Sequence, residues 1–289
     1  MLYLERKGCI MSDHFLPLSE QKQFLEESIA NAERSLLDKP PGTLNIQPKH
    51  SMIQFFHRLD SITPRVYLPR KEEALIKALA QKDYDQKFLK AAYNVKEQLD
   101  ALSALHGARS ASYLFQPLAA VYNSLSETRK QLVSPYVLPD DLFIQQWLSV
   151  PYAGLGFSPQ DPEIMTDRGE RVRSKSEKII ADKLFSLGIP YRYAFPVSIK
   201  GLGMVYADFT ILDIRERREL IIEHFGMMLD AEYSTRTYRK IDHYQNAGYT
   251  LDDDLLISFE SELYVFQAKT FEAKIRDRLM PDGDFSIRN

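Results

Sequence analysis

The sequence has 289 residues, of which 44% are hydrophobic and 27% charged, the proportions of a globular protein with a sizeable core. The formal net charge of -3 excludes a general polyanion binder of the histone type, so contacts with nucleic acid would need local basic patches. The single cysteine, Cys9, excludes an intramolecular disulfide and a cysteine-rich zinc site. No apolar run reaches the roughly 18 residues of a membrane span. Glu5, Arg6 and Lys7 stand where a signal peptide needs apolar residues, so a cytoplasmic protein without a membrane partner is expected.

The first half of the chain is predicted to be mainly helical, with a small sheet near its beginning. A helix is expected from Ser19 to the stop at Pro40, because Leu25 and Ile29 recur at helical spacing. Short strands are then predicted in TLNIQ, SMIQFFHR and RVYLPR, which are bounded by proline and polar turns. Helical periodicity returns over residues 71–132.

Proline and glycine mark a division of the chain. They are concentrated in VSPYVLPDD and SVPYAGLGFSPQDPEI, which lie between residues 133 and 165. We therefore expect an N-terminal region of residues 1–150 and a second domain of residues 151–289.

The second domain is predicted to alternate helices and strands. A helix in RSKSEKIIADKLFSLGIP precedes an extended YRYAFPVSI and a hairpin in VYADFTILDIRERRELIIEHFG. A helix in AEYSTRTYRKIDHYQNAG, a strand in DLLISFES and a closing helix in AKTFEAKIRDRL follow. This order predicts an α/β fold.

The hairpin is expected to bring two carboxylates together. If its turn spans residues 214–217, Phe209 lies opposite Ile222 on one face, and Asp208 lies opposite Glu223 on the other. Directly paired residues have Cβ atoms about 5 Å apart, where two ionised carboxylates repel by roughly 3 kcal/mol at an effective dielectric near 20. A bound cation, a shared proton or a nearby lysine would offset this repulsion.

Glu177 is a third candidate carboxylate, on the helix before the hairpin. It lies at helical spacing before Ile180, Ala181 and Leu184, on the stripe that should face the sheet. The segment SKSE is also a capping box, in which Glu177 would only fix the helix start. Both interpretations stay open.

The residue types favour a hard cation and a nearby positive charge. Oxygen ligands suit Mg²⁺ or Mn²⁺, which can orient a water for attack on a phosphodiester. Lys240, on the helix after the hairpin, is the candidate for stabilising the charge that develops during hydrolysis. The alternative for Lys240 is a solvated surface lysine.

The order of these residues resembles the PD-(D/E)XK nuclease superfamily, the restriction-endonuclease-like fold. The similarity covers about residues 165–260 and rests on SKSEKIIADKL, YADF and IIEHFG. More narrowly, ADF, EHFGM and YRKIDHYQNAG are similar to a group of bacterial nuclease-like proteins in which Glu-His-Phe/Leu-Gly closes the second strand. The resemblance implies a central mixed sheet flanked by helices, here preceded by a mainly helical region with a small β-sheet.

The resemblance also implies a role for each candidate residue. Asp208, Glu223 and the main-chain carbonyl of His224 would bind Mg²⁺ or Mn²⁺. Glu177 would bind or orient a water, and Lys240 would polarise the attacking water or the phosphate. Nucleic acid, with DNA favoured, is the implied partner, and a protein partner or homodimer stays open.

Two positions depart from the superfamily pattern. Ala207 replaces a proline that is not a ligand, and Phe225 occupies the usual lysine position. In the superfamily this lysine can migrate to a neighbouring helix, and Lys240 is such a candidate. His224 could assist instead, although strand alternation directs it away from Glu223.

Other functions stay open at this stage. The chain could be an inactive nuclease fold that binds nucleic acid or protein, with Phe55 or Phe56 stacking on a base or covering a helix. Basic residues cluster at the start of the first helix of the second domain: Arg168, Arg171, Arg173, Lys175 and Lys178. They could contact a phosphate backbone, or they could be solvated residues of an exposed helix start. Zinc held by His224 and His243 is a weaker alternative. The sequence lacks a Gly-x-Ser-x-Gly elbow and a P-loop.

Overall fold

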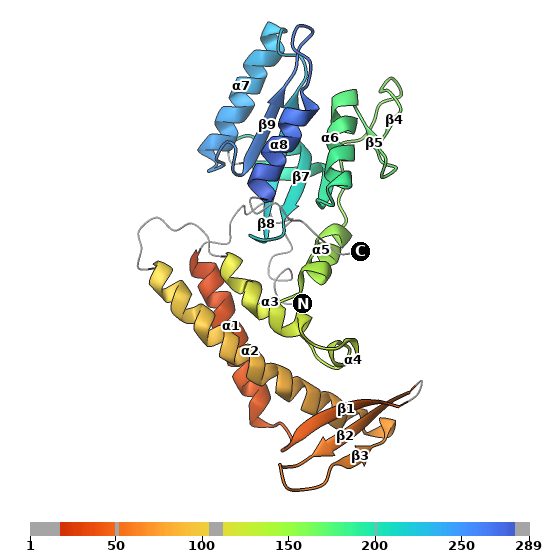
Figure 1. Cartoon of the computed structure of the whole chain (residues 1–289). Coiled ribbons are helices and arrows are strands. Elements are labelled where there is room, and N and C mark those ends of the chain that lie inside the picture. The colour runs from red at the N-terminus through yellow and green to blue at the C-terminus, as the bar shows by residue number, and fades with distance from the viewer. Residues whose placement is uncertain (1–17, 50–51, 104–111, 200, 281–289) are drawn as a thin grey trace. The chain divides into compact units, whose positions relative to one another are not determined.

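The computed structural model describes residues 18–49, 52–103, 112–199 and 201–280, which belong to two compact units (Figure 1). The chain divides between Phe143 and Ile144, whereas the sequence placed the division at residue 150. This division lies within the Pro- and Gly-rich stretch of residues 133–165, and Trp147 belongs to the second unit, where its indole Nε1 donates to Glu219 Oε1 at 2.6 Å. No helix among these residues is long and apolar enough to cross a bilayer.

The N-terminal unit combines helices with a three-stranded antiparallel sheet in the order β1-β2-β3, so the predicted short strands are confirmed. Its elements are α1 (Leu18–Leu37), β1 (Thr43–Lys49), β2 (Met52–Arg58), β3 (Val66–Leu68), η1 (Arg70–Glu72), α2 (Glu73–Ser103), η2 (Ser112–Phe115), α3 (Gln116–Asn123) and α4 (Glu127–Lys130). The helix expected from Ser19 to Pro40 is also confirmed. Leu25 and Ile29 pack with Tyr84 and Phe88 in the core between α1 and α2.

The C-terminal unit contains a four-stranded mixed sheet with helices on both faces, which confirms the α/β class. Its elements are most of α5 (Asp140–Ser149), β4 (Ile164–Met165), β5 (Arg171–Val172), α6 (Lys175–Ser186), β6 (Tyr191–Ile199), β7 (Gly203–Asp213), β8 (Arg218–Phe225), α7 (Ala231–Asn246), β9 (Leu255–Phe259) and α8 (Ala268–Leu279). The strand order is β6-β7-β8-β9, in which the first two pairs are antiparallel and the last is parallel. The predicted hairpin and the helices around it are present.

The two faces of this sheet pack against different helices because strand side chains alternate. Leu220 and Ile222 share a buried cluster with Ile180 of α6 and Ile275 of α8. Ile221, between them, belongs to a second cluster with Tyr244 of α7. Side chains of α7 therefore meet the sheet on the face opposite to α6 and α8.

The pairing of β6 with β7 is interrupted at Ala194, a position that we call the kink. Ala194 has a left-handed backbone, with φ of 48°, which costs a residue with a Cβ about 1–2 kcal/mol. Tyr193 belongs to the cluster under α6 and α8, whereas Phe195 belongs to the cluster under α7. Because β6 and β7 pair at Tyr193↔Phe209 and Phe195↔Ala207, the kink lies level with Asp208.

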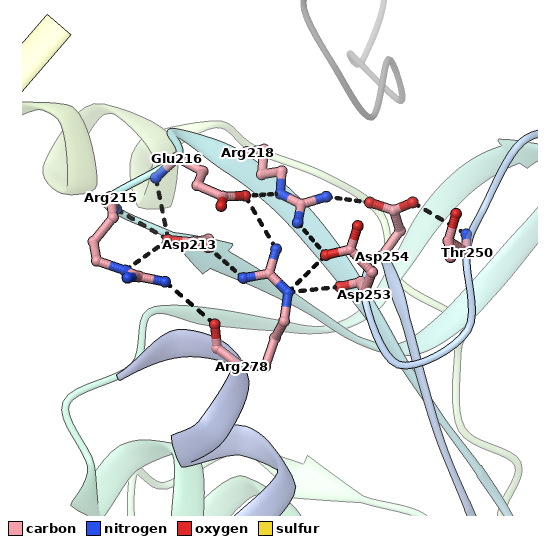
Figure 2. Close-up of polar contacts among 8 residues, drawn as sticks. All are labelled: Asp213, Arg215, Glu216, Arg218, Thr250, Asp253, Asp254 and Arg278. Atoms are coloured by element: carbon pink, nitrogen blue, oxygen red, sulfur yellow. Dashed lines mark hydrogen bonds and ion pairs between the residues drawn. The ribbon is translucent and has the colours of Figure 1, made fainter. Parts of the chain in front are cut away.

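A network of ion pairs fixes the other end of the hairpin. Figure 2 shows Arg218 and Arg278 between carboxylates of the hairpin turn and of the segment before β9. Arg278 lies 3.0 Å from Asp213, 3.1 Å from Glu216 and 2.8 Å from Asp253. Arg218 bonds Glu216, Asp253 and the fully buried Asp254. The network ties α8 and the entry to β9 to the hairpin that carries the candidate carboxylates.

Arg278→Ala is expected to destabilise the C-terminal unit by about 3 kcal/mol, because it leaves partly buried carboxylates facing one another without a cation. Urea unfolding followed by the fluorescence of Trp147, the single tryptophan, measures this unit. Arg276→Ala is the matched control: Arg276 lies on the same helix, is half exposed and pairs with Glu272, so its loss should cost less than about 1 kcal/mol. Equal effects of the two substitutions would contradict the role of the network.

Candidate functional site

The candidate carboxylates lie where β7 and β8 separate. The expected pairs Phe209↔Ile222 and Ile211↔Leu220 are present, and the turn spans residues 214–217 as predicted. The expected direct pairing of Asp208 with Glu223 is not formed, because the pairing of β7 with β8 ends at Phe209↔Ile222. Beyond this point β7 pairs only with β6, and β8 pairs only with β9. The two carboxylates therefore lie at a divergence of strands.

Glu223 is buried with both carboxylate oxygens bonded to α7. Its exposed fraction is 1%. Lys240 Nζ lies 2.7 Å from Glu223 Oε2, and Tyr244 Oη donates to Oε1 at 2.6 Å. Lys240 and Tyr244 are four residues apart, so they project from one side of the helix. The helix thus supplies a cation and a neutral donor to the same carboxylate.

Lys240 is not the solvated surface lysine that the sequence left open. Burial disfavours its charged form, but the carboxylates of Glu223 and Asp208 outweigh burial and raise the pKa of Lys240 above its usual value. Phe225, at the usual lysine position of the superfamily, is buried and stacks on Phe259 with ring centroids 5.7 Å apart. An ammonium group thus reaches the carboxylates from the neighbouring helix while an aromatic ring fills the strand position.

Asp208 faces the same group of charges but is bonded differently. Its Oδ2 accepts the main-chain N–H of His224 at 2.6 Å. Burial, followed by the charge of Glu223, raises the pKa of Asp208 well above its usual value, and the charge of Lys240 opposes this only in part. Within the described residues, no hydrogen bond reaches Asp208 Oδ1. One oxygen of Asp208 is consequently available for a ligand or a proton.

Glu177 is held by the helix start, but only half of the predicted capping box forms, because its side chain bonds the N–H of Arg173 and not that of the N-cap residue Ser174. Ser174 Oγ accepts the Glu177 N–H at 3.0 Å, while Glu177 Oε2 accepts Arg173 N–H at 2.8 Å. The same oxygen accepts the Tyr193 hydroxyl at 2.6 Å. Glu177 also contributes to the raised pKa of Asp208, so its charge acts on the candidate site. Glu177 can therefore bond the helix start and also lie near the carboxylates of the candidate site.

His224 directs its side chain away from Glu223. Its Nδ1 lies 2.9 Å from Ser258 Oγ, and its ring meets Phe266 edge to face at 5.0 Å. Burial lowers the pKa of His224, which favours the neutral imidazole. His243 lies instead on α7, with its ring toward Gly201, so the structure does not join the two histidines of the zinc alternative.

Most of the basic residues near α6 are bound within the unit. Arg168 stacks on Tyr191, and Arg171 stacks on Phe157. Arg173 donates to the carbonyl oxygens of Leu155 and Gly156. Lys178 bridges Asp167 and Asp182. These contacts give this part of the basic group an intramolecular role, while Lys175 is exposed.

The cation-binding capacity of the site rests on two carboxylates. No group of three or more His, Cys, Asp or Glu side chains in the described part of the chain is arranged to hold a metal ion. Mg²⁺, however, commonly uses one or two carboxylates and keeps several waters. Asp208 Oδ1 accepts no hydrogen bond from the described residues, whereas both Glu223 oxygens already accept Lys240 and Tyr244, so a cation would have to share Glu223 with these donors. The His224 carbonyl as a further ligand stays a prediction.

Two tyrosines in contact with the candidate residues were not predicted. Tyr244 was visible only as a residue four positions after Lys240, which is the spacing of one helix face. Tyr193 belongs to an extended segment whose aromatic residues suggested only a core. A strand pattern cannot show that a buried hydroxyl meets a carboxylate on another element.

No family model, curated protein or solved structure matches this chain in the comparisons with known proteins. The site therefore has to be interpreted from its own geometry.

The raised pKa of Asp208 predicts how the stability of the metal-free protein depends on pH. Folded Asp208 keeps its proton at pH values where the unfolded chain, with an aspartate pKa of about 4, has lost it. The free energy of unfolding therefore falls as the pH rises from the unfolded pKa through the folded pKa. Asp208→Asn cannot ionise, so its stability relative to the wild type should increase with pH.

This difference can be measured by urea unfolding in EDTA between about pH 4 and pH 8. Asp242→Asn is the matched control because Asp242 is exposed on α7, and its curve should follow the wild type. A stability difference between Asp208→Asn and the wild type that stays constant with pH would contradict the raised pKa of Asp208.

Proposed function

We propose that the C-terminal unit hydrolyses phosphodiester bonds of nucleic acid, with DNA as the substrate class that the resemblance favours. The observation that carries this proposal is the ammonium of Lys240, 2.7 Å from the buried carboxylate of Glu223 and within the electrostatic field of Asp208. An ion pair that only stabilised the fold would need Lys240 and Glu223 alone. It would not need Asp208 beside them, where the ionised form of Asp208 is disfavoured.

The order of elements supports a restriction-endonuclease-like core. A helix bearing Glu177 precedes a hairpin with Asp208 on one strand and Glu223 on the next, and the sheet is mixed with helices on both faces. Lys240 on the following helix agrees with a migrated lysine. These features agree with the pattern of the PD-(D/E)XK superfamily except at Ala207 and Phe225.

Each residue of the candidate site would have a separate role in the hydrolysis. A divalent cation, when bound, supplies positive charge and a coordinated water of lowered pKa. Asp208 and Glu223 would hold this cation, while Tyr244 fixes the orientation of Glu223. Lys240 would stabilise the negative charge that develops on the phosphoryl oxygens, which in such sites is worth 10²–10³ in rate. Glu177, close to Asp208, would orient a water.

Cleavage of plasmid and single-stranded DNA with Mg²⁺, Mn²⁺ or EDTA tests the proposal. We expect metal-dependent cutting that falls at least about 100-fold in Asp208→Asn, Glu223→Gln and Lys240→Ala, because each removes a charge required at the reacting phosphate. Matched controls on exposed positions of α7 are Glu232→Gln and Arg239→Ala, which should cut at the wild-type rate.

The absence of cutting by a folded wild-type protein on these substrates would contradict the proposal. If DNA binding then persisted unchanged in all three site variants, the chain would be an inactive nuclease fold used for recognition. That second function is favoured by one observation: protein donors already occupy both oxygens of Glu223.

A further inference from the structure

The sheet of the N-terminal unit has one face that packs on α2 and one that does not. Leu44, Ile46, Phe55 and Leu68 belong to a cluster with Ile76 of α2. The alternate positions form the other face, which we call the outer face; they are Thr43, Asn45, Gln47, Lys49, Met52, Gln54, Phe56, Arg58 and Tyr67. The strands are drawn in orange in Figure 1.

Aromatic and planar groups gather on this outer face. Phe56 and Tyr67 are directly paired across β2 and β3, with ring centroids 5.8 Å apart and planes at 69°. The guanidinium of Arg65 lies 4.7 Å from the centre of the Phe56 ring. Tyr67 is 51% exposed, although a tyrosine that served only to fill a core would be buried. The three groups offer π-faces and a guanidinium plane to a ligand.

The charge on the outer face has one sign. Lys49, Arg58 and Arg65 are exposed, and among the described residues no ion pair joins any of them to a carboxylate; the charge of Arg58 acts on Asp60, beyond the end of β2. No strand position of this face carries Asp or Glu. Asp60 follows the end of β2, and its Oδ1 accepts the N–H groups of Ile62 and Thr63. The chain as a whole has a net charge of -3, so the positive charge of the outer face is a local feature and does not follow from the overall composition.

We propose that the outer face binds single-stranded nucleic acid. Unpaired bases can stack on tyrosine, on phenylalanine and on guanidinium planes, whereas bases inside a duplex are already stacked and cannot reach a flat sheet. Lys49 and Arg58 lie on neighbouring strands, where they can contact the phosphates between stacked bases. Asn45 and Gln54 add amide groups that can bond to base edges. An acidic protein partner would satisfy the charges but not the stacking groups.

The test is fluorescence anisotropy with labelled 12-nucleotide single strands of DNA and of RNA and with a 12-base-pair duplex. EDTA and Asp208→Asn in every protein sample remove any contribution of cleavage. We expect single strands to bind more tightly than the duplex, and Tyr67→Ala and Arg65→Ala each to weaken this binding by about five- to twentyfold. The two phosphate contacts of Lys49 and Arg58 predict a fall of about sevenfold between 50 and 200 mM salt.

Two control variants distinguish a loss of binding at the outer face from a general effect of removing a tyrosine or an arginine. Tyr93→Ala and Arg34→Ala remove an exposed tyrosine and an exposed arginine from helices of the same unit, and both should bind as the parent protein does. No binding of single strands, equal preference for the duplex, or equal losses in the control variants would overturn the proposal. Binding without any cleavage by the wild type would leave this proposal standing and contradict only the nuclease function.

Discussion

The buried carboxylate of Glu223 is the constraint on which the C-terminal unit depends. A carboxylate with an exposed fraction of 1% has lost its hydration and needs hydrogen-bond donors or cations in place of water. Lys240 and Tyr244 supply both from one side of α7, so the helix is fixed to the sheet at this point. The same contacts place an ammonium beside a second carboxylate, Asp208. The contacts that hold α7 on the sheet therefore also determine the arrangement of charges at the candidate site.

The divergence of the strands explains why these charges gather here. A continued ladder would have given Asp208 and Glu223 only a cross-strand contact, but pairing between β7 and β8 stops one position earlier. The kink at Ala194 lies beside this point, and the Asp208 carboxylate takes the main-chain N–H of His224 that separation from β7 leaves available. The irregular backbone thus makes room for the polar groups of the candidate site between two apolar clusters of the sheet. The ion-pair network around Arg278 holds the opposite end of the hairpin closed.

The sequence was sufficient for the elements and for the pairs next to the site, because periodicity and turn position determine them. Phe209↔Ile222 and the turn after Asp213 followed from alternation alone. Alternation could not show where pairing would end, since the kink arises at Ala194, a residue without a turn signal. Lys240 was predicted as a charge near the carboxylates, but the contact of Tyr244 depends on how α7 packs. The division of the chain lies within the Pro- and Gly-rich stretch, but composition could not show that Trp147 contacts Glu219 of the second unit.

Binding of Mn²⁺ to the metal-free protein, measured by calorimetry and by the electron paramagnetic resonance of the ion, tests the central claim most directly. If Asp208 and Glu223 hold a cation, the wild type binds Mn²⁺ at one site. Asp208→Asn loses this site, and Asp242→Asn retains it. Absence of Mn²⁺ binding by the folded wild type, or equal binding by Asp208→Asn, would contradict the claim. The carboxylates would then serve only to anchor α7 to the sheet.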